Sequence, residues 1–127
     1  MPLYTVSSHK PLDETQKQKI VSGITRIHCQ LTNAPAMFVQ VVFSFNVPLQ
    51  KNKKVHLIGS IRSGRSGDLK QKLIDQFELL FSEVLAGGQD ITQIVLIDVP
   101  ASWTIEGGEI MPEPGEEAAW MERLNLS

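Results

Sequence analysis

Apolar and polar positions along the chain follow two patterns, one typical of strands and one typical of helices. Residues 3–8 form a short run of strand-forming side chains. Residues 37–46, 55–61 and 91–99 are longer runs rich in β-branched and aromatic residues. Such runs favour extended backbone. We expect each of these four segments to form a β-strand.

Between these segments the apolar residues recur every three or four positions, which predicts two amphipathic helices. The first helix is expected within residues 12–31, where one face carries Ile20, Ile24, Ile27 and Leu31. Asp13 and Glu14 supply the negative charge that suits a helix start. The second helix precedes "AGG" at residues 86–88, and its apolar face carries Leu69, Leu73, Phe77, Leu80, Phe81 and Val84. A short third helix is expected in residues 116–124, after a tail rich in Gly and Pro.

The resulting order is strand–helix–strand, repeated once, which predicts an α+β fold. Two β-α-β units side by side give a ferredoxin-like arrangement, a four-stranded sheet with both helices on one face. The 127 residues fit one domain, residues 1–127. The strands are apolar with little alternation, most clearly in "VVF" and "IVLI". Both faces of the sheet therefore need cover, which predicts burial against other subunits.

Composition and charge argue against several classes of protein. The net charge is −2 and the Lys and Arg residues are scattered, which argues against a nucleic-acid surface. No apolar run approaches the roughly 18 residues of a membrane span, and the start lacks a signal-peptide pattern. The single cysteine, Cys29, excludes an internal disulfide and indicates a reducing, cytoplasmic location. We expect Cys29 to be a small core residue.

Pro2 is an unusual residue before a strand, because proline has no backbone N–H. If Met1 is removed, Pro2 becomes a secondary amine with the pKa of an α-amino group, about 8. Such a group can act as a general acid or base near neutral pH. With Met1 attached, the nitrogen of Pro2 is a tertiary amide and cannot act as an acid or a base. The alternative is that Pro2 is a structural detail of the chain start.

Arg62 and Arg65 lie in "IRSGRSGDL", at the end of a predicted strand and just before a predicted helix. Two guanidinium groups near a helix N-terminus suit a carboxylate, which arginine binds through two parallel hydrogen bonds. A phosphate is a second possibility, although the Walker pattern is absent. The alternative is a solvated loop without a ligand.

His28 and Glu106 are the remaining candidates. His28 falls on the apolar face of the first helix, so it is either a hydrogen-bonded core residue or a donor to a substrate carboxylate. Glu106 follows apolar Ile105 and precedes two glycines, so it is either a turn residue or a carboxylate that positions water. No cluster of His, Cys and carboxylate residues has metal-binding spacing, and we expect neither a metal nor another cofactor.

Taken in order, these segments resemble the tautomerase superfamily, and most of all its cis-3-chloroacrylic acid dehalogenase branch. The resemblance spans about residues 2–124 and is carried by "MPLYTVS", "ITRIHCQLTN", "GSIRSGRSGDLKQKL" and "TIEGGEIMPEPGEEAAW". The last two segments are the most specific. The resemblance implies the β-α-β fold predicted above and a homotrimer, whose subunits bury the bare face of the sheet.

The resemblance also implies a role for each candidate. Pro2, after methionine removal, is the acid–base group, and Glu106 activates water. His28, Arg62 and Arg65 hold and polarise the carboxylate of a small acid. Hydration or dehalogenation of a small unsaturated acid is then the favoured activity, because Glu106 is present.

One position departs from the branch. A tyrosine that orients the water there is replaced here by Val95, which has no hydroxyl. This substitution favours keto–enol tautomerisation as the second assignment, with decarboxylation of a small oxo acid as the third. A non-catalytic trimer that binds a small anion is the alternative outside the enzymes.

Overall fold

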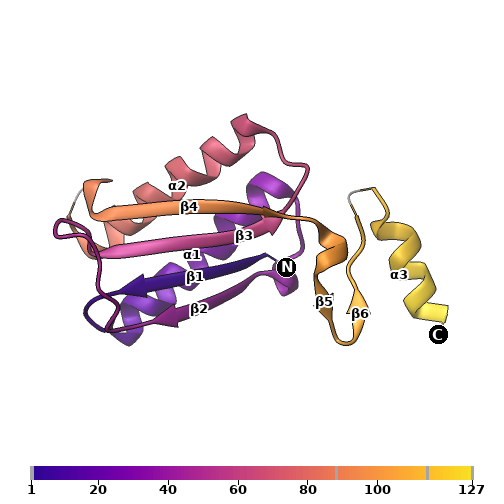
Figure 1. Cartoon of the computed structure of the whole chain (residues 1–127), viewed down its shortest axis with the longest axis horizontal. Coiled ribbons are helices and arrows are strands. Elements are labelled where there is room, and N and C mark those ends of the chain that lie inside the picture. Colours follow the sequence, from indigo (N-terminus) through magenta and orange to yellow (C-terminus); the bar gives the residue numbers. More distant parts are fainter. Residues whose placement is uncertain (1, 88, 114, 127) are drawn as a thin grey trace.

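The computed structural model describes residues 2–87, 89–113 and 115–126 of the chain. Two β-α-β units are followed by a C-terminal extension (Figure 1). The first unit comprises β1 (Leu3–Ser8), α1 (Glu14–Thr32) and β2 (Gln40–Ser44), and the second comprises β3 (Val55–Arg62), α2 (Gly67–Leu85) and β4 (Thr92–Val99). The extension holds β5 (Ile105–Glu106), β6 (Glu109–Ile110) and α3 (Glu117–Leu126). Three short 3-10 helices, η1 (Ala36–Phe38), η2 (Gln89–Ile91) and η3 (Ala101–Trp103), join these elements.

The four long strands form one sheet in the order β2-β1-β3-β4. Within each unit the strands are parallel, whereas β1 and β3 are antiparallel where the units meet. Both long helices lie on the same face of the sheet (Figure 1). The predicted α+β fold, with its repeated β-α-β unit, is therefore confirmed.

Local signals fix the ends of the helices close to the predicted positions. Asp13 caps α1 by accepting a hydrogen bond from the Gln16 backbone N–H, and the Gln16 side chain accepts one from Asp13 in return. Asn33 ends this helix in the left-handed conformation. The Ser66 side chain caps α2 by accepting from the backbone N–H of Leu69. Of the predicted end at residues 86–88, Gly88 lies outside the described residues.

The core lies between the sheet and the two helices. Burial alternates along β3, where Val55, Leu57 and Ile61 face the helices. Ile24 of α1 and Phe77 of α2 are fully buried against this face. Cys29 was expected in the core, but it is only half-buried, because it lies on α1 beside the buried stripe rather than within it.

The opposite face of the sheet is open and apolar. Leu3, Val42, Val95 and Ile97 are each between 37% and 49% exposed. Large apolar side chains on one continuous sheet face are typical of a surface that another protein covers.

Two parts of the sequence prediction need correction. The strand expected over residues 37–46 starts only at Gln40, because η1 follows Pro35. Sequence patterns also missed the β5–β6 hairpin, whose strands are two residues each and turn through Gly107 and Gly108. Both glycines have positive φ, at 59° and 81°, which a tight two-residue turn requires.

No helix in the described part of the chain is both long enough and apolar enough to cross a membrane.

Candidate active site

Four of the five candidate residues gather at the end of the sheet where β1 begins. Because β1 and β3 are antiparallel, with Leu3 opposite Ser60, the start of β1 lies beside the end of β3. Arg62 is the last residue of β3 and pairs with Val99 at the end of β4. The C-terminal half of α1 contributes His28, and the loop before α2 contributes Arg65. The topology therefore brings together residues that are far apart in the sequence.

A cavity of about 480 Å³ lies at this end of the sheet. Four of the predicted site residues line it: Pro2, His28, Arg62 and Arg65. The rest of the wall comes from the end of α1 and η1, from η3, and from the C-terminal extension: Thr32, Asn33, Ala34, Pro35, Met37, Phe38, Ala101, Met111, Pro112, Glu117, Trp120 and Met121. Its size and largely apolar wall, with a few converging polar groups, are typical of a small-molecule site.

His28 is buried, with 1% of its surface exposed. Its Nδ1 atom shares a 2.7 Å hydrogen bond with the hydroxyl of Tyr4. Burial, and then the charge of Arg65, lower the pKa of His28 to about 4. The imidazole is therefore neutral at neutral pH. Its Nε2 atom is buried without a hydrogen-bond partner among the described residues.

The two arginines provide the positive charge of the cavity. Arg65 lies in a loop that turns at Gly64, whose φ of 99° is readily adopted only by glycine. Burial, and then the charge of Arg62, lower the pKa of Arg65 below its usual value. The Nε atom of Arg65 is buried with no hydrogen-bond partner in the described part of the chain. Two positive charges at neighbouring, partly buried positions repel each other, and a bound anion relieves this repulsion.

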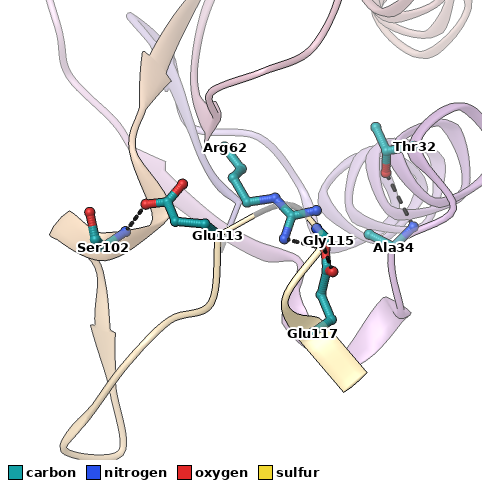
Figure 2. Close-up of polar contacts among 7 residues, drawn as sticks. All are labelled: Thr32, Ala34, Arg62, Ser102, Glu113, Gly115 and Glu117. Carbon is teal, nitrogen blue, oxygen red and sulfur yellow. Dashed lines mark hydrogen bonds and ion pairs between the residues drawn. The ribbon is translucent and has the colours of Figure 1, made fainter. Parts of the chain in front are cut away.

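Glu117 from α3 contacts one of these arginines (Figure 2). Its Oε1 atom lies 2.8 Å from Nη1 of Arg62, and its Oε2 atom accepts a hydrogen bond from the backbone N–H of Gly115. A hydrogen bond from its own backbone N–H, together with Arg62, lowers the pKa of Glu117. Glu117 is a site residue that the sequence pattern did not indicate. Its position in the first turn of a helix was visible, but its contact with Arg62 depends on tertiary structure.

Glu106 is not among the described residues that line the cavity. It lies at the end of β5, opposite Glu109 across the hairpin, and is half-buried. Residues on the return arm, Met111 and Pro112, do line the cavity. Glu106 therefore lies off the cavity wall, whereas the chain that follows the hairpin contributes to it.

Both tryptophans and Val95 divide between the cavity wall and the surface. Trp120 lines the cavity and donates a hydrogen bond from Nε1 to the carbonyl of Ile110, whereas Trp103 is 77% exposed. Val95 lies on the open face of the sheet and does not line the cavity. Among the described residues, no group of three or more His, Cys, Asp or Glu side chains could hold a metal ion.

Neither a protein-family model nor a curated protein matches the sequence. Solved structures do match the fold. The chain is similar to a crystal structure of a member of the cis-3-chloroacrylic acid dehalogenase family, at 26% identity and a TM-score of 0.84, over 94% of this chain and 90% of that chain.

Two further structures match in fold alone. A fused 4-OT described as a wild-type asymmetric trimer has 21% identity and a TM-score of 0.77, over 93% of this chain and 98% of that one. Pt0534, inactivated by 2-oxo-3-pentynoate, has 17% identity and a TM-score of 0.75, over 86% of this chain and 95% of that one. The predicted resemblance to the tautomerase superfamily is confirmed, because the structural neighbours of the chain belong to it.

Proposed function

We propose that this chain, with its tautomerase-superfamily fold, is a cofactor-free enzyme that moves a proton on a small 2-oxo or unsaturated carboxylic acid. Pro2, freed by removal of Met1, is the acid–base group. The observation that carries the proposal is one cavity lined by Pro2, His28, Arg62 and Arg65. Residue 1 lies outside the described residues, so its removal is part of the proposal.

The arginines bind the substrate carboxylate. Arginine presents two parallel N–H donors to a carboxylate, and both guanidinium groups belong to the same wall. Together with His28 they also face the negative charge that develops on the carbonyl oxygen of a 2-oxo acid as it becomes an enolate. Fixed donors aimed at developing charge are an efficient way to lower a reaction barrier.

Pro2 exchanges the proton. It is buried, and the two guanidinium groups line the same cavity. Burial and nearby positive charge both favour the neutral, proton-accepting form of a secondary amine. The amine takes a proton from the carbon next to the carbonyl, and the electrons of the broken C–H bond move onto oxygen. Return of the proton to the other end of the enolate completes a keto–enol tautomerisation.

Hydration is the second candidate. In this reaction Glu106 directs water to the β-carbon, and protonated Pro2 delivers a proton to the α-carbon. With a 3-halo acrylate, the resulting halohydrin loses halide. The motif around Glu106 and the similarity to a cis-3-chloroacrylic acid dehalogenase family member favour this reaction. The position of Glu106 outside the cavity of the single chain, and valine at position 95, favour tautomerisation.

We further propose that the chain assembles as a homotrimer. A neighbouring fused 4-OT is described as a trimer. The open apolar face of the sheet offers the surface that such an assembly covers.

The test combines mass and turnover. Intact mass of the cell-made protein reports whether Met1 is removed. Proton NMR then follows enol forms of 2-oxo acids, acetylenic acids and 3-halo acrylic acids, and also detects decarboxylation. We expect Pro2→Ala to lower turnover at least about 100-fold, the scale of general acid–base catalysis. Pro11→Ala, at an exposed loop position, is the matched control.

Two results separate enzyme from binding protein. Covalent labelling of Pro2 by 2-oxo-3-pentynoate, the inactivator of the neighbour Pt0534, supports catalysis. Retained Met1, or full turnover by the Pro2→Ala variant, defeats it and leaves a trimer that binds a small anion.

A further inference from the structure

Tyr4 lies next to the cavity without lining it. It is the only tyrosine of the chain and is fully buried on β1. Its ring packs edge-on against Phe77 and His28, with centroid separations of 5.2 Å and 5.6 Å. Its hydroxyl lies 2.7 Å from Nδ1 of His28. Ring packing on two sides and a hydrogen bond at the tip hold this side chain in one orientation.

The bond between Tyr4 and His28 admits two proton arrangements. A neutral imidazole carries one N–H, on either Nδ1 or Nε2. If Nδ1 carries it, the imidazole donates to the Tyr4 oxygen, and the phenol O–H needs a second acceptor in the core. If Nε2 carries it, the phenol O–H donates to Nδ1 and is satisfied. Burial raises the pKa of Tyr4 above its ordinary value, so the phenol keeps its proton.

Hydrogen-bond accounting favours the second arrangement. A buried donor left without an acceptor is costly, and buried polar groups are nearly always paired. Among the described residues, the first arrangement leaves two buried groups unpaired, the phenol O–H and the bare Nε2, whereas the second leaves only Nε2–H. With Nδ1 occupied by Tyr4, Nε2 is the nitrogen of His28 left for a ligand.

Two donors then remain for an occupant of the cavity. Nε2 of His28 and Nε of Arg65 are both buried without partners among the described residues, and both side chains line the cavity. Two unpaired N–H donors in one cavity wall fit an acceptor oxygen of a carboxylate, carbonyl or enolate.

We propose that Tyr4 is a positioning residue whose hydroxyl donates to Nδ1 of His28 and thereby fixes the tautomer in which Nε2–H donates to a substrate oxygen. The tautomer itself is independent of catalysis, whereas the role of Nε2–H toward substrate rests on the proposed function. Without this bond, His28 divides between two tautomers, and only one of them offers a donor to an anionic oxygen.

Nitrogen-15 NMR of the histidine ring tests the tautomer directly, because protonated and bare ring nitrogens have well-separated shifts. The His28→Gln variant assigns the signals by their loss. We expect a protonated Nε2 and a bare Nδ1 in the unmodified protein, and a mixture in Tyr4→Phe, which keeps the ring but removes the hydroxyl. A protonated Nδ1 in the unmodified protein overturns the proposal, and this measurement does not require the variant to fold.

Pyruvate serves as the probe of the donor role. We expect its addition to shift the Nε2 signal in the unmodified protein, and no change at Nε2 overturns the role toward a ligand. This readout needs no turnover. An inactive protein with the expected tautomer and a pyruvate-dependent shift therefore rejects the proposed enzyme while leaving the role of Tyr4 standing.

A double-mutant cycle tests the effect on turnover. We expect Tyr4→Phe to lower kcat/KM about five- to tenfold, the scale of one hydrogen bond. In the His28→Gln background the same substitution has no tautomer to disturb, so its effect should disappear. Equal losses in both backgrounds indicate a merely structural role and overturn the proposal.

Discussion

The absence of a side chain at Gly59 leaves space for the ring of Tyr4, so substitution of Gly59 by alanine tests how tightly this ring is packed. Gly59 lies on β3 directly opposite Tyr4 on β1. A Cβ atom placed there would lie 2.6 Å from Cε1 of Tyr4 and 2.8 Å from Cδ2 of Leu96. The leucine can rotate away, but the tyrosine ring is held by Phe77 and by the bond to His28. Either the ring or the strand must therefore move.

The expected size follows from two opposing effects. Overpacking a well-filled core costs about 1–3 kcal/mol. Replacing glycine by alanine in a strand recovers about 0.5–1 kcal/mol of backbone conformational entropy. We therefore expect Gly59→Ala to lower the free energy of unfolding by about 1–2 kcal/mol, which lowers Tm by roughly 3–10 °C in a domain of this size.

Urea unfolding and thermal melts at one fixed protein concentration measure this loss, because assembly makes stability concentration-dependent. Gly67→Ala is the matched control. Gly67 is the first residue of α2, nothing lies within 4 Å of its added Cβ, and alanine is a better helix former. We expect this control to be neutral or slightly stabilising. A Gly59→Ala variant as stable as the unmodified protein would refute the argument that Tyr4 is rigidly held.

Three further predictions concern the site charge, the buried imidazole and the sheet face. Glu117→Gln should lower KM for a small monocarboxylate up to about fivefold, because Arg62 is released from a partly exposed ion pair worth about 0–1 kcal/mol. Steady-state kinetics measures this change, and a higher KM contradicts it. The pKa of His28 is about 4 when folded and about 6.5 when unfolded, so the unfolded chain binds more protons between these values and stability falls as pH drops through them. Between pH 7 and pH 5, the free energy of unfolding should therefore fall by about 1–2 kcal/mol less in His28→Gln than in the unmodified protein. Unfolding measured at the two pH values tests this, and equal losses in the two proteins refute it. Ile97→Lys on the open sheet face should reduce the particle mass measured by light scattering, whereas Gln30→Lys on the exposed surface of α1 should not. An unchanged mass for Ile97→Lys would argue against assembly through this face.

Local patterns predicted the two β-α-β units because each element carries its own signal. The four-residue spacing from Ile20 through Ile24 to His28 placed the imidazole on the buried side of α1, where it lies. Arg62 and Arg65 were expected together because a strand end and a helix start are adjacent in this topology. These inferences needed only periodicity and chain order.

Contacts made by the C-terminal extension could not be predicted in the same way. Glu106 and Glu117 are both acidic residues near apolar neighbours, and nothing in their local sequence shows which one faces the cavity. The answer depends on where the hairpin turns at Gly107 and Gly108, and on how α3 packs. The alternation along β1 did contain a usable signal for Tyr4, because it places this residue on the same side of the strand as buried Val6.

Both ends of the chain contribute to the cavity, through Pro2 at one end and Trp120 and Met121 at the other. A purification tag joined before Pro2 would acylate its nitrogen, and one added after α3 would be attached to the helix that supplies Trp120 and Met121 to the cavity. An affinity handle inserted into the exposed loop between β2 and β3, around residues 50–52, lies at the end of the strands away from the label N (Figure 1). A handle at that position leaves Pro2, Trp120 and Met121 without an added group.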